Sequence, residues 1–135
     1  MIGLIMPSNP KEDAQALVDC MLPFAVKMLK GHGGFLPFGG VIDLNNQVIH
    51  QGPSSGQKQP TCNELIDILR SNHKKAAREN TIIASCSVYD VRVKSPEKGI
   101  LQDTISMELD HKTDYSVIVH YPYIIAENNL TFEVP

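Results

Sequence analysis

The amino-acid sequence predicts an α+β fold in which a mainly antiparallel sheet carries two helices packed on one face. Two segments repeat apolar residues at the three-and-four spacing of an amphipathic helix, and several shorter segments alternate apolar and polar residues as strands do. The chain has 135 residues, 42% of them hydrophobic, which suits one core and a single α+β domain over residues 1–135. The expected order is α-β-β-α-β-β-β, with a further strand at the carboxyl end.

The first helix is expected to begin near Pro10. Asn9 supplies a side-chain cap, a proline in the first turn loses no hydrogen bond, and the glycines at 31, 33 and 34 supply the stop. Pro23 predicts a kink, or else a split into two helices, because its ring clashes with the carbonyl four residues earlier. Residues at helical spacing form one stripe expected to face the core: Leu17, Cys20, Met21, Phe24, Met28 and Leu29.

Residues 35–51 change to an aromatic and β-branched pattern that predicts a β-hairpin, with Asn45 and Asn46 at its tip. Residues 52–60 contain only Gly, Pro, Ser, Gln and Lys, which predicts a loop. Thr61 and Glu64 then form a capping box that starts the second helix. Its apolar residues at helical spacing are Leu65, Ile66, Ile68, Leu69 and Ala76.

Residues 81–93 predict a strand whose apolar residues change face part-way along. One face carries Ile82, Ala84, Cys86 and Val88, and the other carries Tyr89, Val91 and Val93. Either a bulge near Val88 or burial of both faces explains the change.

Residues 105–109 and 115–119 each alternate apolar and polar side chains, which predicts a second hairpin. For Leu109 to share a face with Val117, the loop must hold an odd number of residues, and a three-residue connection in the stretch from His111 to Asp114 fits.

The tail from Leu130 to Val134 predicts a last edge strand. Both helices need an apolar surface to cover, and the simplest solution places them on the same face of the sheet.

Three patches of sequence resemble a group of small bacterial proteins that have no assigned activity. The patches are GGFLPFG at 33–39, VYDVRV at 88–93 and YPY at 121–123. The resemblance implies no catalytic residue. The order of elements is also similar to the profilin and roadblock layout, which serves as a platform for protein contacts.

Composition limits the kinds of partner. The net charge of −3 lacks the basic stripe of a nucleic-acid binder, and no segment has the roughly 18 uninterrupted apolar residues of a membrane span. The amino terminus has no basic region before its apolar run, so we expect a cytoplasmic protein. Three cysteines at wide spacing predict reduced, mostly buried thiols rather than disulfides.

The motifs that could carry chemistry are weak. Residues 52–56 match the GxSxG nucleophile elbow around Ser54, but Pro60 and a loop separate them from the next helix, so we predict that Ser54 is not a nucleophile. The same loop lacks the Gly-Lys pair of a phosphate loop, and the five histidines show neither HxH nor HExxH. We expect no cofactor and no metal. Cys86 is expected to pack in the core, and Asp90 to pair with Arg92.

The leading hypothesis is a non-enzymatic protein-binding domain, of the kind found among small bacterial inhibitor or immunity proteins. Residues 100–135 hold six acids and one base, so this third carries −5 and the remainder carries +2. Glu108, Asp110 and Asp114 gather at one end of the second hairpin, and we predict that they steer a basic partner protein.

Two alternatives remain open. One is a small-ligand-binding protein or enzyme whose site forms around His120, Tyr123 and Asp90. The other is a self-associating scaffold, a homo-oligomer that uses an apolar helix face or an edge strand.

Overall fold

A computed structural model describes residues 9–52, 60–127 and 129–133 of the chain. The predicted order of elements and the α+β class are confirmed. The elements are α1 (Pro10–His32), β1 (Phe38–Asp43), β2 (Val48–Gln51), α2 (Cys62–Arg78), β3 (Ile82–Lys94), β4 (Leu101–His111), β5 (Ser116–Ala126) and β6 (Asn129–Phe132).

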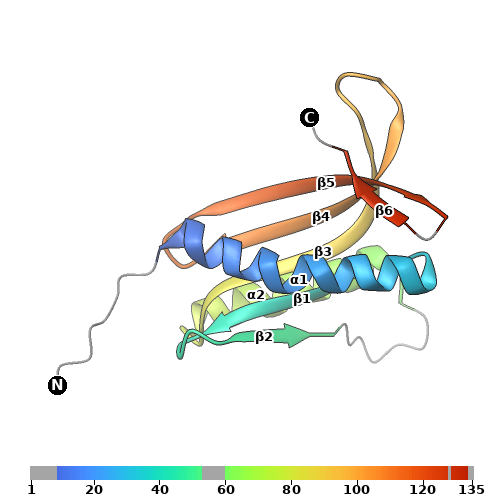
Figure 1. The fold of residues 1–135 in the computed structure, drawn as a ribbon. Coiled ribbons are helices and arrows are strands. Elements are labelled where there is room, and N and C mark those ends of the chain that lie inside the picture. Colours follow the sequence, from blue (N-terminus) through green and yellow to red (C-terminus); the bar gives the residue numbers. More distant parts are fainter. Residues whose placement is uncertain (1–8, 53–59, 128, 134–135) are drawn as a thin grey trace.

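All neighbouring strands pair antiparallel in the order β2-β1-β3-β4-β5-β6 (Figure 1). The long strands β3, β4 and β5 are neighbours in this sheet, with β3 and β4 at its centre, and the β3–β4 hairpin projects beyond the body of the molecule (Figure 1). The predicted last strand is confirmed, because β6 pairs with the end of β5 from Tyr123 to Ala126.

The ends of α1 form as the sequence predicts. The Asn9 side chain accepts hydrogen bonds from the backbone of Lys11 at 3.0 Å and Glu12 at 3.2 Å. At the other end Gly33 has a φ of 74° and donates its N–H to the carbonyl of Leu29, a conformation that glycine adopts without strain. The helix runs unbroken past Pro23, so the alternative of two separate helices is wrong.

The buried side of α1 differs from the predicted stripe. The buried residues are Leu17, Val18, Met21, Ala25 and Leu29, whereas Cys20 is exposed and Phe24 is partly so. Phe24 instead packs edge-on against the rings of Phe38 and His50 at the margin of the sheet. The prediction failed because the buried positions follow four-residue steps along the helix, at 17, 21, 25 and 29. Position 25 is therefore buried although it carries a small alanine, and position 24 is not, although it carries a phenylalanine.

The remaining local signals are confirmed. The hydroxyl of Thr61 accepts a hydrogen bond from the backbone N–H of Glu64 at 3.1 Å, which caps α2. Asn46 has a φ of 62° at the β1–β2 turn. The β4–β5 loop holds three residues between His111 and Tyr115, closed by a 2.8 Å backbone bond, and its last residue, Asp114, has a φ of 66°.

The two helices lie on opposite faces of the sheet, one in front of it and one behind (Figure 1). Adjacent residues of β1 show this directly: a Cβ on Gly39 would meet Leu69 and His73 of α2, whereas one on Gly40 would meet Met21 of α1. The prediction that both helices pack on one face is therefore wrong. Its error lay in treating the apolar surface of the sheet as one-sided.

Strand β3 explains why both faces need cover. Every residue from Ile83 to Val88 is buried, and the β3–β4 register is unbroken from Ala84 to Lys94. Burial of both faces is thus the correct reading of the change of face along this strand, and the bulge near Val88 is excluded. A strand that is buried on both faces needs a helix or another layer of structure packed against each face of its sheet.

The two faces differ in composition and in how fully they are covered. The α1 face of the sheet joins α1 in the main apolar core, which includes Cys86, Val88, Ile105, Met107 and Leu109. The α2 face carries the alternate residues of the same strands, among them Ser85, Ser87, Glu108 and Asp110. Helix α2 packs chiefly against β1 and β3, so the β4–β5 half of the α2 face stays open.

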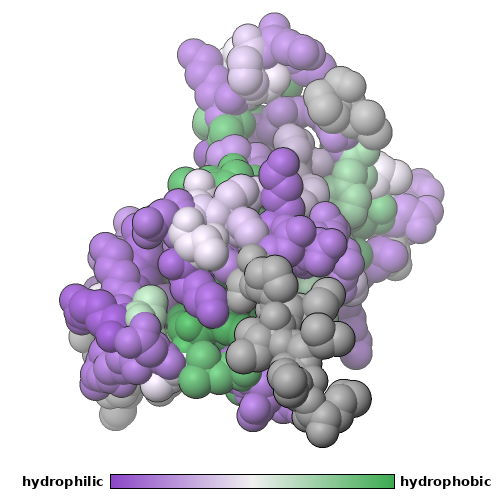
Figure 2. Space-filling view, turned by 90° about the vertical axis from the view of Figure 1, so that its left-hand side faces the viewer, coloured by the Kyte–Doolittle hydropathy of each residue, from purple (hydrophilic) through white to green (hydrophobic). Residues whose placement is uncertain are grey.

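Seen from the end at which α1 begins, the surface is mainly hydrophilic and is interrupted by small hydrophobic patches (Figure 2). Among the described residues, no helix combines the length and hydropathy needed to cross a membrane.

Candidate functional site

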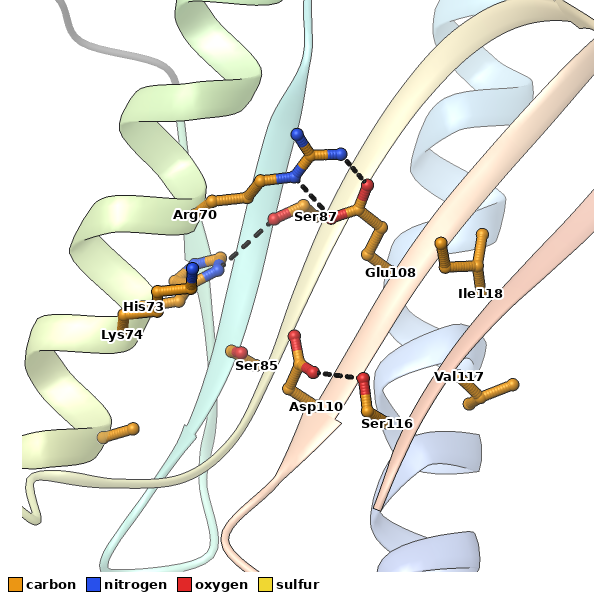
Figure 3. A pocket seen from close by; sticks show the side chains of 11 residues that line it. Arg70, His73, Lys74, Ser85, Ser87, Glu108, Asp110, Ser116, Val117 and Ile118 are labelled. Carbon is orange, nitrogen blue, oxygen red and sulfur yellow. Dashed lines mark hydrogen bonds and ion pairs between the residues drawn. The ribbon is translucent and has the colours of Figure 1, made fainter. Parts of the chain in front are cut away.

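A groove with a volume of about 390 Å³ lies on the α2 face, between α2 and strands β4 and β5 (Figure 3). We call it the α2 groove. Helix α2 forms one wall, β3 and β4 form the floor, and β5 forms the opposite rim. The lining residues are Arg70, His73, Lys74, Ala77, Ser85, Ser87, Glu108, Asp110, Ser116, Val117 and Ile118.

An ion pair between α2 and β4 crosses the upper part of the groove (Figure 3). Arg70 binds Glu108 through two nitrogens, with its Nε 2.8 Å from Oε1 and its Nη2 in contact with Oε2. Tyr89 donates a third hydrogen bond to Oε2 at 2.7 Å. The bond from Arg70 holds the pKa of Glu108 below its ordinary value, although partial burial acts in the opposite direction. Both oxygens of this carboxylate are therefore engaged within the molecule.

His73 connects three elements below this ion pair. Its Nε2 lies 3.0 Å from Oε1 of Gln51 on β2, and its Nδ1 lies 3.3 Å from the hydroxyl of Ser87 on β3. An amide oxygen only accepts, so Nε2 carries the proton and Nδ1 accepts from the serine. Burial lowers the pKa of His73 below its ordinary value of 6.5, so the ring is neutral at pH 7.

The rim of the groove carries groups that are free to meet a partner. Asp110 is exposed and accepts one hydrogen bond from the Ser116 hydroxyl at 2.6 Å. Lys74 is exposed on the facing wall, and Ile118 on β5 exposes 54% of its surface although it is a large apolar residue.

The structure arranges the predicted acidic cluster only partly as expected. Glu108 and Asp110 do share the face opposite Met107 and Leu109, and Asp114 lies exposed on the adjoining turn. Glu108, however, is neutralised by Arg70, and its side chain is only 12% exposed. The acids available to a partner at this end are Asp110 and Asp114.

Asp90 has a different partner from the predicted one. Tyr123 donates its hydroxyl to Asp90 at 2.7 Å, whereas Arg92 binds Asp103 at 3.2 Å. Burial raises the pKa of Asp90, and burial likewise raises the pKa of Tyr123, with the bond to Asp90 adding to the effect. The predicted Asp90–Arg92 pair is therefore wrong.

The three residues of the alternative ligand site are not brought together. Asp90 and Tyr123 meet on the α1 face. His120 lies on the α2 face, where its Nδ1 is 2.7 Å from the hydroxyl of Ser106. An odd separation along β5 sends His120 and Tyr123 to opposite sides of the sheet.

The other predicted positions have mixed outcomes. Cys86 is fully buried in the core as predicted, and burial raises its pKa well above the ordinary thiol value. All three cysteines are free, but Cys20 and Cys62 are exposed, so the expectation of mostly buried thiols is wrong. The described residues contain no cluster of three or more metal-ligating side chains. Ser54 and the rest of its loop from 53 to 59 lie outside the described residues.

Sequence reasoning missed the groove's main polar residues, Arg70, His73 and Ser87. One signal was present, because His73 continues the buried stripe of Leu65 and Leu69 at four-residue steps. A histidine at such a position needs hydrogen-bond partners from the sheet below. Arg70 gave no comparable signal, because a basic residue towards the carboxyl end of a helix is also explained by the helix dipole.

The chain matches no protein-family model, and no curated protein or solved structure shows significant similarity to it. The resemblance of the three patches to small bacterial proteins therefore stays a prediction.

Proposed function

We propose that this chain is a non-enzymatic protein-binding domain and that the α2 groove is its binding surface. One observation carries the proposal: exposed Ile118 and Asp110 lie on one side of the groove and exposed Lys74 on the other, above a floor whose polar groups are already bonded to one another. Among the described residues, no buried side-chain polar atom lacks a hydrogen-bond partner. Groups available for recognition are thus on the rim, where another protein can reach them.

The burial of the floor supports binding over catalysis. Ser87 and neutral His73 have the donor and acceptor order of a nucleophile and its base. Their exposed fractions are only 3% and 6%, which leaves a substrate atom little access to the hydroxyl. The same contacts are explained by the need to satisfy polar groups under α2.

The acids at the β4–β5 end of the groove favour a basic partner. Asp110 lines the groove and Asp114 lies exposed on the adjoining turn, and neither is paired with a cation in the structure as described. Acids in this position steer a basic surface towards the groove and raise its association rate at low salt. A partner that combines basic side chains with an apolar one would pair with these acids and cover Ile118. The inhibitor or immunity role and the cytoplasmic location stay predictions.

The proposal is tested by photo-cross-linking in cells of the source organism. A photoreactive benzoylphenylalanine replaces Lys74 on the groove wall in one strain. In the matched control it replaces Lys27, which is exposed on the outer side of α1. We expect an adduct between this chain and a different protein from position 74 only, and mass spectrometry identifies that protein.

Two outcomes would overturn the proposal. One is the absence of any adduct with a different protein from position 74, given equal expression and a folded variant. The other is an equal pattern of adducts from positions 74 and 27, which would mean that the groove has no special role. An adduct between two copies of the chain bears on self-association and does not count for the groove.

A further inference from the structure

Among the described residues, strand β5 is paired along only part of its outer edge. It pairs with β4 from Ser116 to Pro122, and β6 covers its outer edge from Tyr123 to Ala126. The pairing extends one residue further, because the carbonyl of Pro122 accepts a hydrogen bond from the backbone N–H of Glu133 at 2.9 Å. Within the described parts of the chain, no strand pairs with the outer edge of residues 116–121. A free edge of this kind is a template for another strand.

The hydrogen-bond pattern of the β4–β5 ladder shows which groups face outward. His111 donates its N–H to the carbonyl of Tyr115, so residue 115 points towards β4. In an antiparallel ladder the backbone N–H and C=O groups of successive residues point to alternate edges of the strand. The backbone groups of residues 117, 119 and 121 therefore also point towards β4, and those of the even-numbered residues point outward. Pro122 fits this assignment in two ways. A proline has no N–H that would be left unpaired at an outward position, and the Pro122 carbonyl accepts the outward hydrogen bond from the N–H of Glu133. The outward backbone groups that no described strand pairs with belong to Ser116, Ile118 and His120, and we call these the free groups of the edge.

We propose that a second copy of this chain pairs with this edge, antiparallel, with the two-fold axis at Ile118. The three free outward residues are symmetric about that position. In this register Ile118 faces Ile118 of the second copy, and Ser116 faces His120. Each of these pairs exchanges both of its backbone bonds, so every free group of the edge is used. A register shifted by one residue either way would leave some of them without partners.

The side chains of the edge agree with this occupant. Residues 116–121 contain no Lys, Arg, Asp or Glu, which are the charges that commonly protect a sheet edge from pairing. Ile118 is 54% exposed, and in the proposed register it packs against its own symmetry mate across the axis. The opposite edge of the sheet, β2, has only four residues. The β5 edge is thus the longer and less protected of the two.

The test uses disulfide cross-linking at the axis. Cys20 and Cys62 are first replaced by serine, because both are exposed. Ile118→Cys then places two thiols opposite each other, where the Cα separation of about 5.5 Å in a hydrogen-bonded antiparallel pair lies within disulfide range. We expect a disulfide-linked dimer on mild oxidation. The matched control is Ile124→Cys, on the same face of β5 and also half-exposed, but paired with β6. This control keeps the proposed edge and should not form a disulfide-linked dimer, because position 124 lies away from the axis.

A second variant measures the free energy of association. Ile118→Lys places two like charges across the axis, and we expect it to raise the dimer dissociation constant at least about tenfold in sedimentation equilibrium. Three results would overturn the proposal: a monomer at all concentrations for the wild type, equal cross-linking of Ile118→Cys and Ile124→Cys, or cross-linking of Val119→Cys instead of Ile118→Cys. Ile118 also lines the α2 groove, so the groove is tested by cross-linking from position 74 in the chain with Ile118 intact, and the outcomes of the two proposals stay distinguishable.

Discussion

The two faces of the sheet are built from the same strands and have opposite characters. On the α1 face, α1 covers a continuous apolar core that extends from β1 to β5. On the α2 face, α2 covers β1 and β3, and the β4–β5 half carries a polar groove with an apolar residue, Ile118, on its rim. The α1 face supplies stability through burial. The other face ties its helix down with hydrogen bonds and leaves surface for recognition.

Two partly buried carboxylates illustrate the same difference. Glu108 on the α2 face accepts three hydrogen bonds, and Arg70 lowers its pKa. Asp90 on the α1 face has a tyrosine as its partner, and burial raises its pKa. Charge is thus stabilised on the polar face and disfavoured on the apolar one.

The largest expected effect comes from truncating the apolar face. Met107→Ala removes a fully buried side chain and leaves a cavity, so we expect a loss of about 2–5 kcal/mol in the free energy of unfolding. Ile118→Ala on the open face should cost less than about 1 kcal/mol. Urea denaturation of both variants at low protein concentration checks the difference. Similar losses would contradict the contrast between the faces.

A smaller effect is expected from the bond network under α2. Arg70→Ala leaves Glu108 largely buried without its cation, and we expect a loss of about 1.5–3 kcal/mol, the range for hydrogen bonds to charged groups. The control is Arg92→Ala, whose exposed pair with Asp103 should contribute at most about 1 kcal/mol. Equal losses from the two variants would mean that the Arg70 pair behaves as a surface salt bridge.

The smallest effect is a dependence of stability on pH. The pKa of His73 lies below 6.5 in the folded protein, so the unfolded chain takes up a proton first as pH falls. The free energy of unfolding should therefore decrease from about pH 6.5 towards pH 5, by at most about 1.4 kcal/mol per pH unit for one proton. His73→Gln should flatten this part of the profile. An unchanged slope in the variant would show that another group is responsible.

Local signals in the sequence predicted most of the fold. The caps at Asn9 and Thr61 and the three-residue loop before Tyr115 depend on neighbouring residues, and all are confirmed. The prediction that both helices lie on one face failed because it depends on which residues of each strand are buried, and strand pairing decides that. Ser85 and Ser87 look like the solvent side of a strand, yet both are buried under α2.

The site was less predictable for the same reason. Glu108 and Asp110 could be placed on one face by counting along the strand. Arg70 lies 38 residues before Glu108 in the sequence, and no pattern in the sequence indicates that it neutralises Glu108. Likewise, Tyr123 becomes the partner of Asp90 only through the pairing of β3, β4 and β5.

The most direct test of the proposed division between the faces compares one charge reversal on each. Asp110→Lys alters the rim of the α2 groove, and Asp103→Lys alters an exposed acid on the α1 face. The measurement is the dissociation constant for the protein that cross-links through position 74, by isothermal titration calorimetry. We predict that Asp110→Lys raises this constant at least about tenfold and that Asp103→Lys leaves it within about twofold. Equal effects of the two reversals, or a larger effect of Asp103→Lys, would contradict the assignment of recognition to the α2 face.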